Sequence, residues 1–129
     1  MDKTVSIQVC AERTQLSRST LRYYERIGLT PPIERDQHGH RRYSEANIEW
    51  INFVNCMRQT GMPLRAIRAF GELHFGNGSP HGRLAILVEH QQRMKAQQAE
   101  LAKALEFIEK KIGRFHQGIA QQEARRAKT

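Results

Sequence analysis

Arginine, serine and tyrosine side chains recur between residues 17 and 29 (SRSTLRYYERIGL). At about 100° per residue in a helix, five of them share one face or its edge: Arg18, Ser19, Arg22, Tyr23 and Arg26. Guanidinium and hydroxyl groups in this pattern bind the phosphate oxygens and base edges of nucleic acid. A solvated basic helix would show the same pattern. The neighbouring elements are therefore needed to distinguish a nucleic-acid-binding helix from a solvated one.

Helix signals bracket the arginine segment. Ser17 can cap the N-terminus by accepting a bond from a backbone N–H, and Gly28 suits the end of the helix. Leu21 and Tyr24 share the opposite face and are expected to be buried. The basic face is therefore expected to point outward.

A first short helix is expected just upstream, from Ser6 to Arg13. Ile7, Cys10 and Ala11 follow the spacing of a core-facing stripe, so Cys10 is expected to be a buried, inert thiol. Residues 14–16 then form a tight turn into the arginine helix. Helix, short turn and helix with a polar outer face is the helix-turn-helix pattern.

Residues 33–44 (IERDQHGHRRYS) predict a small hairpin after the two prolines that stop the arginine helix. The turn lies at residues 36–39, and four side chains surround it: Arg35, Arg41, Arg42 and Tyr43. Beside a helix-turn-helix, such a hairpin is a wing whose arginines contact phosphate or a minor groove. A polar surface loop is the alternative.

Two further helices are expected next. Ser44 caps a helix over residues 45–59, and Pro63 favours the first position of the following helix. The free N–H groups at the start of that helix could hold a phosphate, with Leu64 and Arg65 beside it.

Residues 76–82 are expected to form a hinge, because glycine and proline are dense there. The preceding residues, 1–75, would be one domain.

Residues 83–119 then carry apolar or glutamine side chains at alternating steps of three and four, which predicts a coiled-coil helix that needs a partner outside the chain. Folding back on its own domain is the alternative. The basic tail, 120–129, is expected to be disordered.

The composition favours a nucleic-acid partner. The 129 residues include 21 Lys plus Arg against 13 Asp plus Glu, for a net charge of +8. No apolar run is long enough to span a membrane, and the N-terminus lacks the apolar core of a signal peptide, so we expect a cytoplasmic protein without membrane contacts. We expect no catalytic residues, no cofactor and no metal. The two cysteines do not form a disulfide framework.

In this order, the segments TLRYYE, RRY and TGMPL, followed by a long heptad helix, resemble the MerR family of bacterial transcription regulators. The resemblance implies an all-α fold with a small β wing: a winged helix-turn-helix followed by an antiparallel coiled coil that makes a homodimer. It also implies that the protein activates a promoter whose spacer between the −35 and −10 elements is too long for RNA polymerase, by distorting the DNA. Protein contacts can offset the free energy cost of this deformation.

The chain departs from the family at several positions. Gln15 stands where relatives carry glycine, and His40 replaces an aromatic residue in the wing. The cysteines of metal-sensing members are absent. Cys56, within INFVNCMRQTGM, resembles the single cysteine of the branch that responds to aldehydes and other electrophiles, and a structural, buried thiol is equally compatible with the sequence.

Two other classes of function remain open at this stage. One is a small cytosolic enzyme acting on thiol-reactive substrates, although no nucleophile–base pair or glycine-rich phosphate loop supports it. The other is an interaction protein that uses only the coiled coil.

Overall fold

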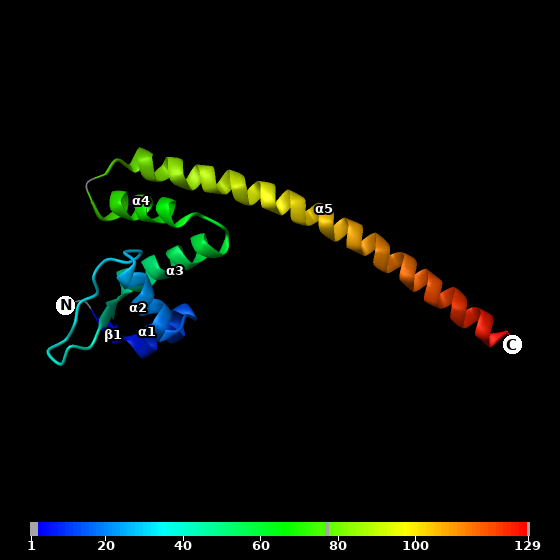
Figure 1. Cartoon of the computed structure of the whole chain (residues 1–129), viewed down its shortest axis with the longest axis horizontal. Coiled ribbons are helices and arrows are strands. Elements are labelled where there is room, and N and C mark those ends of the chain that lie inside the picture. The colour runs from blue at the N-terminus through cyan, green and yellow to red at the C-terminus, as the bar shows by residue number, and fades with distance from the viewer. Residues whose placement is uncertain (1–2, 77, 129) are drawn as a thin grey trace. The chain divides into compact units, whose positions relative to one another are not determined.

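The computed structural model describes residues 3–76 and 78–128 (Figure 1). The chain forms two compact units, the first ending at Val88 and the second beginning at Glu89. The predicted fold class is confirmed: helices dominate, and the only β-structure in the described part is one small two-stranded sheet with an isolated bridge in the wing.

The sheet joins the start of the chain to the end of the wing. Strand β1 (Thr4–Ser6) pairs antiparallel with strand β2 (Arg42–Ser44), and Val5 lies opposite Tyr43. Strand β1 was not predicted, because a strand of three residues is too short to show an alternating pattern. The pairing fixes the wing to the base of the first helix.

The two helices of the helix-turn-helix form as predicted. Helix α1 (Ile7–Thr14) begins where Ser6 Oγ accepts a bond from Val9 N at 3.3 Å. Helix α2 (Arg18–Arg26) begins where Ser17 Oγ accepts one from Thr20 N at 3.1 Å. Both serines satisfy an N–H group that the helix itself leaves without a partner.

The turn between α1 and α2 has a left-handed residue at its first position. Gln15 has φ of 58° and ψ of 32°, and its backbone N–H donates to Ala11 O. A side chain in this conformation costs about 1 kcal/mol, which glycine avoids.

Replacing Gln15 with glycine should therefore raise the free energy of unfolding by about 1 kcal/mol. Urea denaturation measures the change. The matched control is Glu12→Gly, in the exposed interior of α1, which should lower the same free energy by about 1 kcal/mol. A destabilised Gln15→Gly protein would contradict this interpretation of the turn.

Helices α3 (Glu45–Gln59) and α4 (Leu64–Phe75) follow in the first unit. Ser44 and Asn47 form a reciprocal capping box at the start of α3, and Gly61 has a φ of 91° in the turn before α4. The buried apolar side chains fall into two clusters. One is built on Cys10, Leu21, Ile33, Tyr43, Ile48 and Ile51. The other is built on Tyr24, Leu29, Trp50, Val54, Met62, Ile67 and Phe70.

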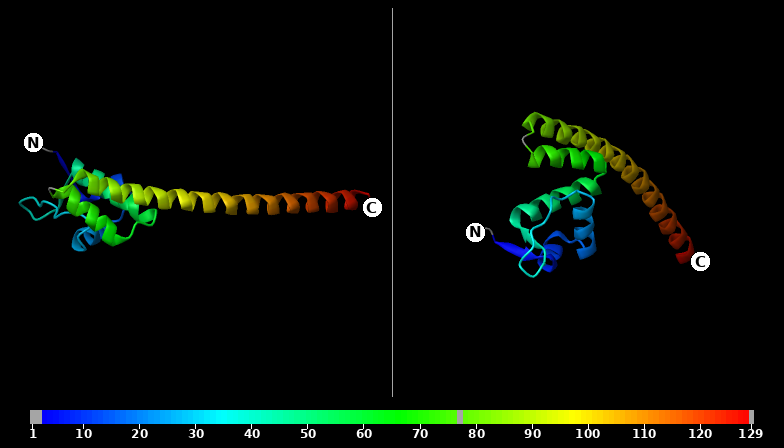
Figure 2. Two further views of the ribbon diagram at one scale, coloured as in Figure 1. Left: turned by 90° about the horizontal axis from the view of Figure 1, so that it is seen from above. Right: turned by 60° about the vertical axis from the view of Figure 1, so that its left-hand side comes forward.

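Helix α5 (Pro80–Ala127) is one continuous helix (Figure 2). Of the predicted hinge, 76–82, residues 76, 78 and 79 lie between α4 and α5, and residue 77 is outside the described residues. Residues 80–82 already form the first turn of α5, so the predicted hinge is too long at its end. However, the first turns of α5 belong to the first unit, since Ile86 and Leu87 pack against the cluster that contains Trp50. The spacing of the predicted coiled-coil seam, extended to the start of α5, includes Leu87, and the structure places this side chain against a cluster of its own unit.

The predicted disorder of residues 120–129 is also wrong as far as Ala127, where α5 ends; residue 129 lies outside the described part. Glycines at 113 and 118 do not interrupt the helix. Each costs only about 1 kcal/mol, and the alanine, glutamine and arginine residues around them favour a helix that is already nucleated.

Candidate nucleic-acid interface

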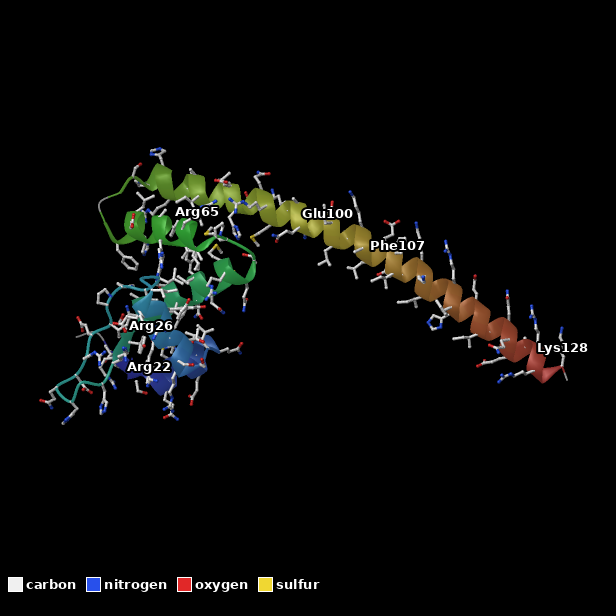
Figure 3. All side chains as sticks on the ribbon, viewed as in Figure 1. Arg22, Arg26, Arg65, Glu100, Phe107 and Lys128 are labelled. Atoms are coloured by element: carbon white, nitrogen blue, oxygen red, sulfur yellow. The ribbon has the colours of Figure 1, made fainter. Side chains whose placement is uncertain are left out.

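The basic face of α2 is exposed, as the sequence predicted. Its five side chains are all exposed to solvent: Arg18, Ser19, Arg22, Tyr23 and Arg26. On the opposite face, Leu21 and Tyr24 are each only 2% exposed. Arg22 and Arg26 both project from α2 (Figure 3), and the Arg26 guanidinium lies 5.3 Å from the centre of the Tyr23 ring. Packing of the apolar face therefore fixes which way the arginines point.

A basic groove lies between the start of α1, the first turns of α2 and the wing. Its volume is about 320 Å³, and its arginines are Arg18, Arg22, Arg41 and Arg42. Ser6, Ile7 and Gln8 line it from the start of α1, and Asp36, Gly39 and His40 line it from the wing. Four guanidinium groups around one opening favour a polyanion such as a nucleic-acid backbone.

The wing is a short hairpin, as predicted. Asp36 N donates to His40 O at 2.8 Å, Arg42 N donates to Glu34 O at 2.7 Å, and an isolated bridge pairs Arg35 with Arg41. Gly39, at the turn, has a φ of 79°. Arg35 donates through Nη1 to Gly39 O at 3.0 Å, so this exposed arginine also braces the turn.

Glu25 ties the wing to α2. Arg41 Nε donates to Glu25 Oε1 at 2.8 Å, and Ile33 N donates to Glu25 Oε2 at 3.1 Å. Burial alone would raise the pKa of Glu25, but these two bonds outweigh it and hold that pKa below its usual value. This role was not predicted, although Glu25 is the only carboxylate between residues 17 and 29.

Arg42 is also held in place. Its Nε donates to Thr4 Oγ1 at 3.1 Å, and its Nη2 donates to Thr4 O at 2.9 Å. Arg41 and Arg42 therefore fasten the wing to α2 and β1 while still lining the groove. This preorganises their position before any ligand binds.

Tyr43 was predicted to contact DNA, and this prediction is wrong. Its side chain is 1% exposed and packs in the same cluster as Cys10. Alternation along β2 turns Tyr43 inward between two neighbours that are only half-buried. Burial also raises its pKa to about 12, so the phenol stays neutral.

The start of α4 presents Leu64 and Arg65 at the surface, and Arg65 is labelled in Figure 3. Leu64 is 36% exposed, and among the described residues no side chain caps this N-terminus. Arg68 donates to Ile27 O, which ties α4 to the end of α2. These features are compatible with a phosphate contact at the start of α4.

The two cysteines differ in exposure. Cys10 is fully buried, and burial raises its pKa to about 11, which confirms an inert thiol. Cys56, on α3, is exposed. Cys56 is therefore not the buried, structural thiol that the sequence left open, and a reagent can reach its side chain.

Neither a metal cluster nor a membrane span is present in the described part of the chain. Residues 3–76 and 78–128 contain no group of three His, Cys, Asp or Glu side chains placed to hold a metal ion. No helix in the same ranges is both long and apolar enough to cross a membrane.

A family model for MerR HTH family regulatory proteins matches residues 5–71. The chain belongs to the MerR family. An uncharacterized HTH-type transcriptional regulator of Haemophilus influenzae is 31% identical to this MerR-family chain over 118 residues, covering 91% of the chain and 87% of that protein. The HTH-type transcriptional regulator AdhR of Bacillus subtilis is 38% identical over 91 residues, covering 70% of the chain and 65% of AdhR.

A solved structure extends the likeness over both compact units of this MerR-family protein. The structure is that of HiNmlR, described as a MerR family regulator lacking the sensor domain and bound to promoter DNA. It matches with a TM-score of 0.81 and 31% identity, covering 91% of this chain and 94% of HiNmlR. These relatives are regulators, which points away from an enzyme.

Proposed function

We propose that this protein is a homodimeric regulator that binds promoter DNA through α2, the wing and the start of α4, and acts in the cytoplasm. The basic groove carries this proposal, because four arginines are held there by α2 and by bonds to Glu25 and Thr4. The bound promoter DNA of HiNmlR supports the same ligand here. The proposed contacts are Arg18, Ser19, Arg22, Tyr23, Arg26, Arg35, Arg41, Arg42, Leu64 and Arg65.

The second unit supports the dimer. On the seam of α5 within this unit, six large apolar side chains are each at least half exposed: Leu101, Leu105, Ile108, Ile112, Phe115 and Ile119. A row of apolar residues at alternating steps of three and four is the seam of a coiled coil, and a second copy of the same helix would cover it.

The charges beside the seam favour one antiparallel register. With Leu101 of one chain against Leu105 of the other at the centre, Lys95 of each chain faces Glu109 of the other. A shift by one heptad in either direction places Lys95 beside Ala102 or His116 instead. In this register Gln98 of each chain lies level with Ile108 of the other chain, and Gln91 lies level with Phe115.

We propose further that the regulator activates transcription by distorting its promoter for RNA polymerase. This mechanism is carried over from the family. It requires protein contacts with the DNA on both sides of the dimer axis, because the free energy of these contacts must offset the free energy cost of deforming the DNA.

The DNA-binding proposal can be tested without knowing the operator. The purified protein selects duplexes from a random-sequence library, and a gel shift measures binding of the selected duplex. Retention of one recurrent sequence, with affinity that falls steeply with salt, is the expected result. Failure to retain any duplex at low salt would overturn the proposal.

Cys56 is the proposed sensor of a small electrophile such as an aldehyde. It is exposed on α3, whereas Cys10 is buried and neutral, so only Cys56 can offer a thiol to a reagent. Cys56→Ser should bind the selected duplex within about twofold of wild type, because it changes one surface atom, and should lose induction by aldehyde.

Transcription in vitro from a promoter that carries the selected sequence measures the effect, with Cys10→Ala as the matched control. The control should be induced as wild type is. Full induction of Cys56→Ser would rule out the thiol and leave a non-covalent signal.

A further inference from the structure

Phe107 is an aromatic residue that the proposed seam does not use. It is 73% exposed, more than any of the six exposed seam residues, and it projects from α5 (Figure 3). At about 100° per residue, its spacing from Leu105 and Ile108 places it about a third of a turn away from the centre of the seam. A second copy of α5 on the seam would therefore leave this ring in solvent.

Positive charge surrounds Phe107 on α5. Four basic residues lie within two turns of it: Lys103, Lys110, Lys111 and Arg114. Two of them are already paired, since Lys103 Nζ lies 3.6 Å from Glu100 Oε1 and Lys110 Nζ lies 3.4 Å from Glu106 Oε1. Lys111 and Arg114 are exposed and form no ion pair with the other residues that the structure describes. Two uncommitted cations therefore lie beside the ring.

The proposed dimer brings two Phe107 rings to one flank of the coiled coil. In the proposed register, Ala104 of one chain lies beside Ala104 of the other, next to the seam. Phe107 follows Ala104 by three residues and Lys111 follows Phe107 by four, so all three share one side of the helix. The two-fold axis places one ring on either side of the alanine pair, about 12 Å apart along the coil at 1.5 Å per residue. We call this set of side chains, taken from both chains, the Phe107 strip: Ala104, Phe107, Lys111 and Arg114.

We propose that the Phe107 strip is a docking surface for an acidic amphipathic helix of another protein. The proposal rests on the homodimer proposed above. Two rings about 12 Å apart match the spacing of apolar side chains that lie two turns apart on one helix. The alanine pair between the rings leaves room for the body of that helix. Acidic side chains beside its apolar stripe would pair with Lys111 and Arg114, whereas a basic helix would be repelled.

The strip favours a protein segment over two other anionic surfaces. A DNA duplex presents its phosphates outward and would leave both phenylalanine rings in water. A membrane surface binds helices with a broad apolar face that basic residues border. The strip offers only one large apolar side chain from each chain, because the other apolar residues of this part of α5 are used by the seam.

A synthetic helical peptide tests this chemistry directly. The probe has leucine on one face, glutamate on the others and a fluorescent label, and fluorescence anisotropy measures its binding to the full chain. Wild type should bind one peptide for each dimer, because only one flank of the coil carries the strip. The same peptide with lysine in place of glutamate should bind at least about tenfold more weakly, since its charges have the same sign as those of the strip.

One variant tests the aromatic part of the strip. Phe107→Ser should weaken binding of the glutamate peptide at least about tenfold, because burial of a phenylalanine side chain favours association by that factor or more. Gln121→Ser is the matched control, since Gln121 lies two heptads along the same side of α5. It should bind the peptide within about twofold of wild type.

A second variant tests the charges. Lys111→Gln combined with Arg114→Gln should weaken binding at least about tenfold and should reduce its dependence on salt, because the dimer loses four cations from the strip. The control is Lys103→Gln combined with Lys110→Gln, which removes lysines that already pair with glutamates. This control should bind within about twofold of wild type.

Equal binding of the two peptides, or unchanged affinity in Phe107→Ser, would overturn the proposal. Preferential binding of wild type to vesicles of anionic phospholipid, lost in Phe107→Ser, would also overturn it and assign the strip to a membrane surface. Light scattering on the same samples separates this inference from the proposed dimer. A dimer that does not bind the glutamate peptide would overturn the docking surface alone, whereas a monomer would overturn the dimer and the two-chain strip together.

Discussion

A protein carrying both Leu101→Asp and Ile108→Asp should be a monomer and should bind its selected duplex at least about a hundredfold more weakly. Each Leu or Ile buried in the dimer contributes about 1.5–3 kcal/mol, and the double variant removes two from each chain. In the proposed register Leu101 lies near the two-fold axis, so the introduced carboxylates of the two chains would also repel one another. Light scattering measures the mass.

The fold of the isolated chain should survive these changes. Leu101 and Ile108 are 64% and 53% exposed in the single chain, so no core packing is lost. The matched control is Lys103→Asp with Lys110→Asp, which introduces two aspartates two positions away on the outer face of α5. The control should stay dimeric. Retained dimer mass in the Leu101 and Ile108 variant would show that the seam is not the interface.

Replacing Arg22 with alanine should weaken binding to the selected duplex by about 1–3 kcal/mol for each half-site. Arg22 is exposed on α2 and lines the groove. If Arg22 reads a base, specificity at one position should relax; if it binds a phosphate, every sequence should lose affinity and the salt slope should fall by about 0.9 for each phosphate no longer neutralised.

The control for Arg22 is Arg93→Ala on α5. It removes the same charge outside the basic groove, from an arginine that pairs with Glu89 at 2.9 Å. Its affinity should stay within about twofold of wild type. Unchanged affinity and salt slope in Arg22→Ala would mean that α2 is not the recognition helix.

Much of the first unit could be predicted because its helices carry explicit start signals. Ser6, Ser17 and Ser44 each accept an N–H bond at the start of a helix in the structure. The apolar positions of α2 also identified its buried face. Local signals of this kind depend on a few adjacent residues, which a sequence shows directly.

The features that escaped prediction depend on contacts between distant segments. Strand β1 exists only because residues 42–44 pair with it, and that pairing turns Tyr43 into the core. The bond between Glu25 and Arg41 joins α2 to the wing, and periodicity along either segment does not show it. Leu87 fits the seam by spacing, yet its side chain packs against the cluster that contains Trp50 in the first unit.

In the proposed complex, two copies of this chain bind one duplex through their basic faces. The most direct test is a footprint of the selected duplex, together with sedimentation of the same complex to count chains. We predict two chains for each duplex and two protected half-sites separated by a whole number of helical turns, since a two-fold dimer places its recognition helices on one face of the DNA. A single chain bound to one half-site, or protection without two-fold symmetry, would contradict this arrangement.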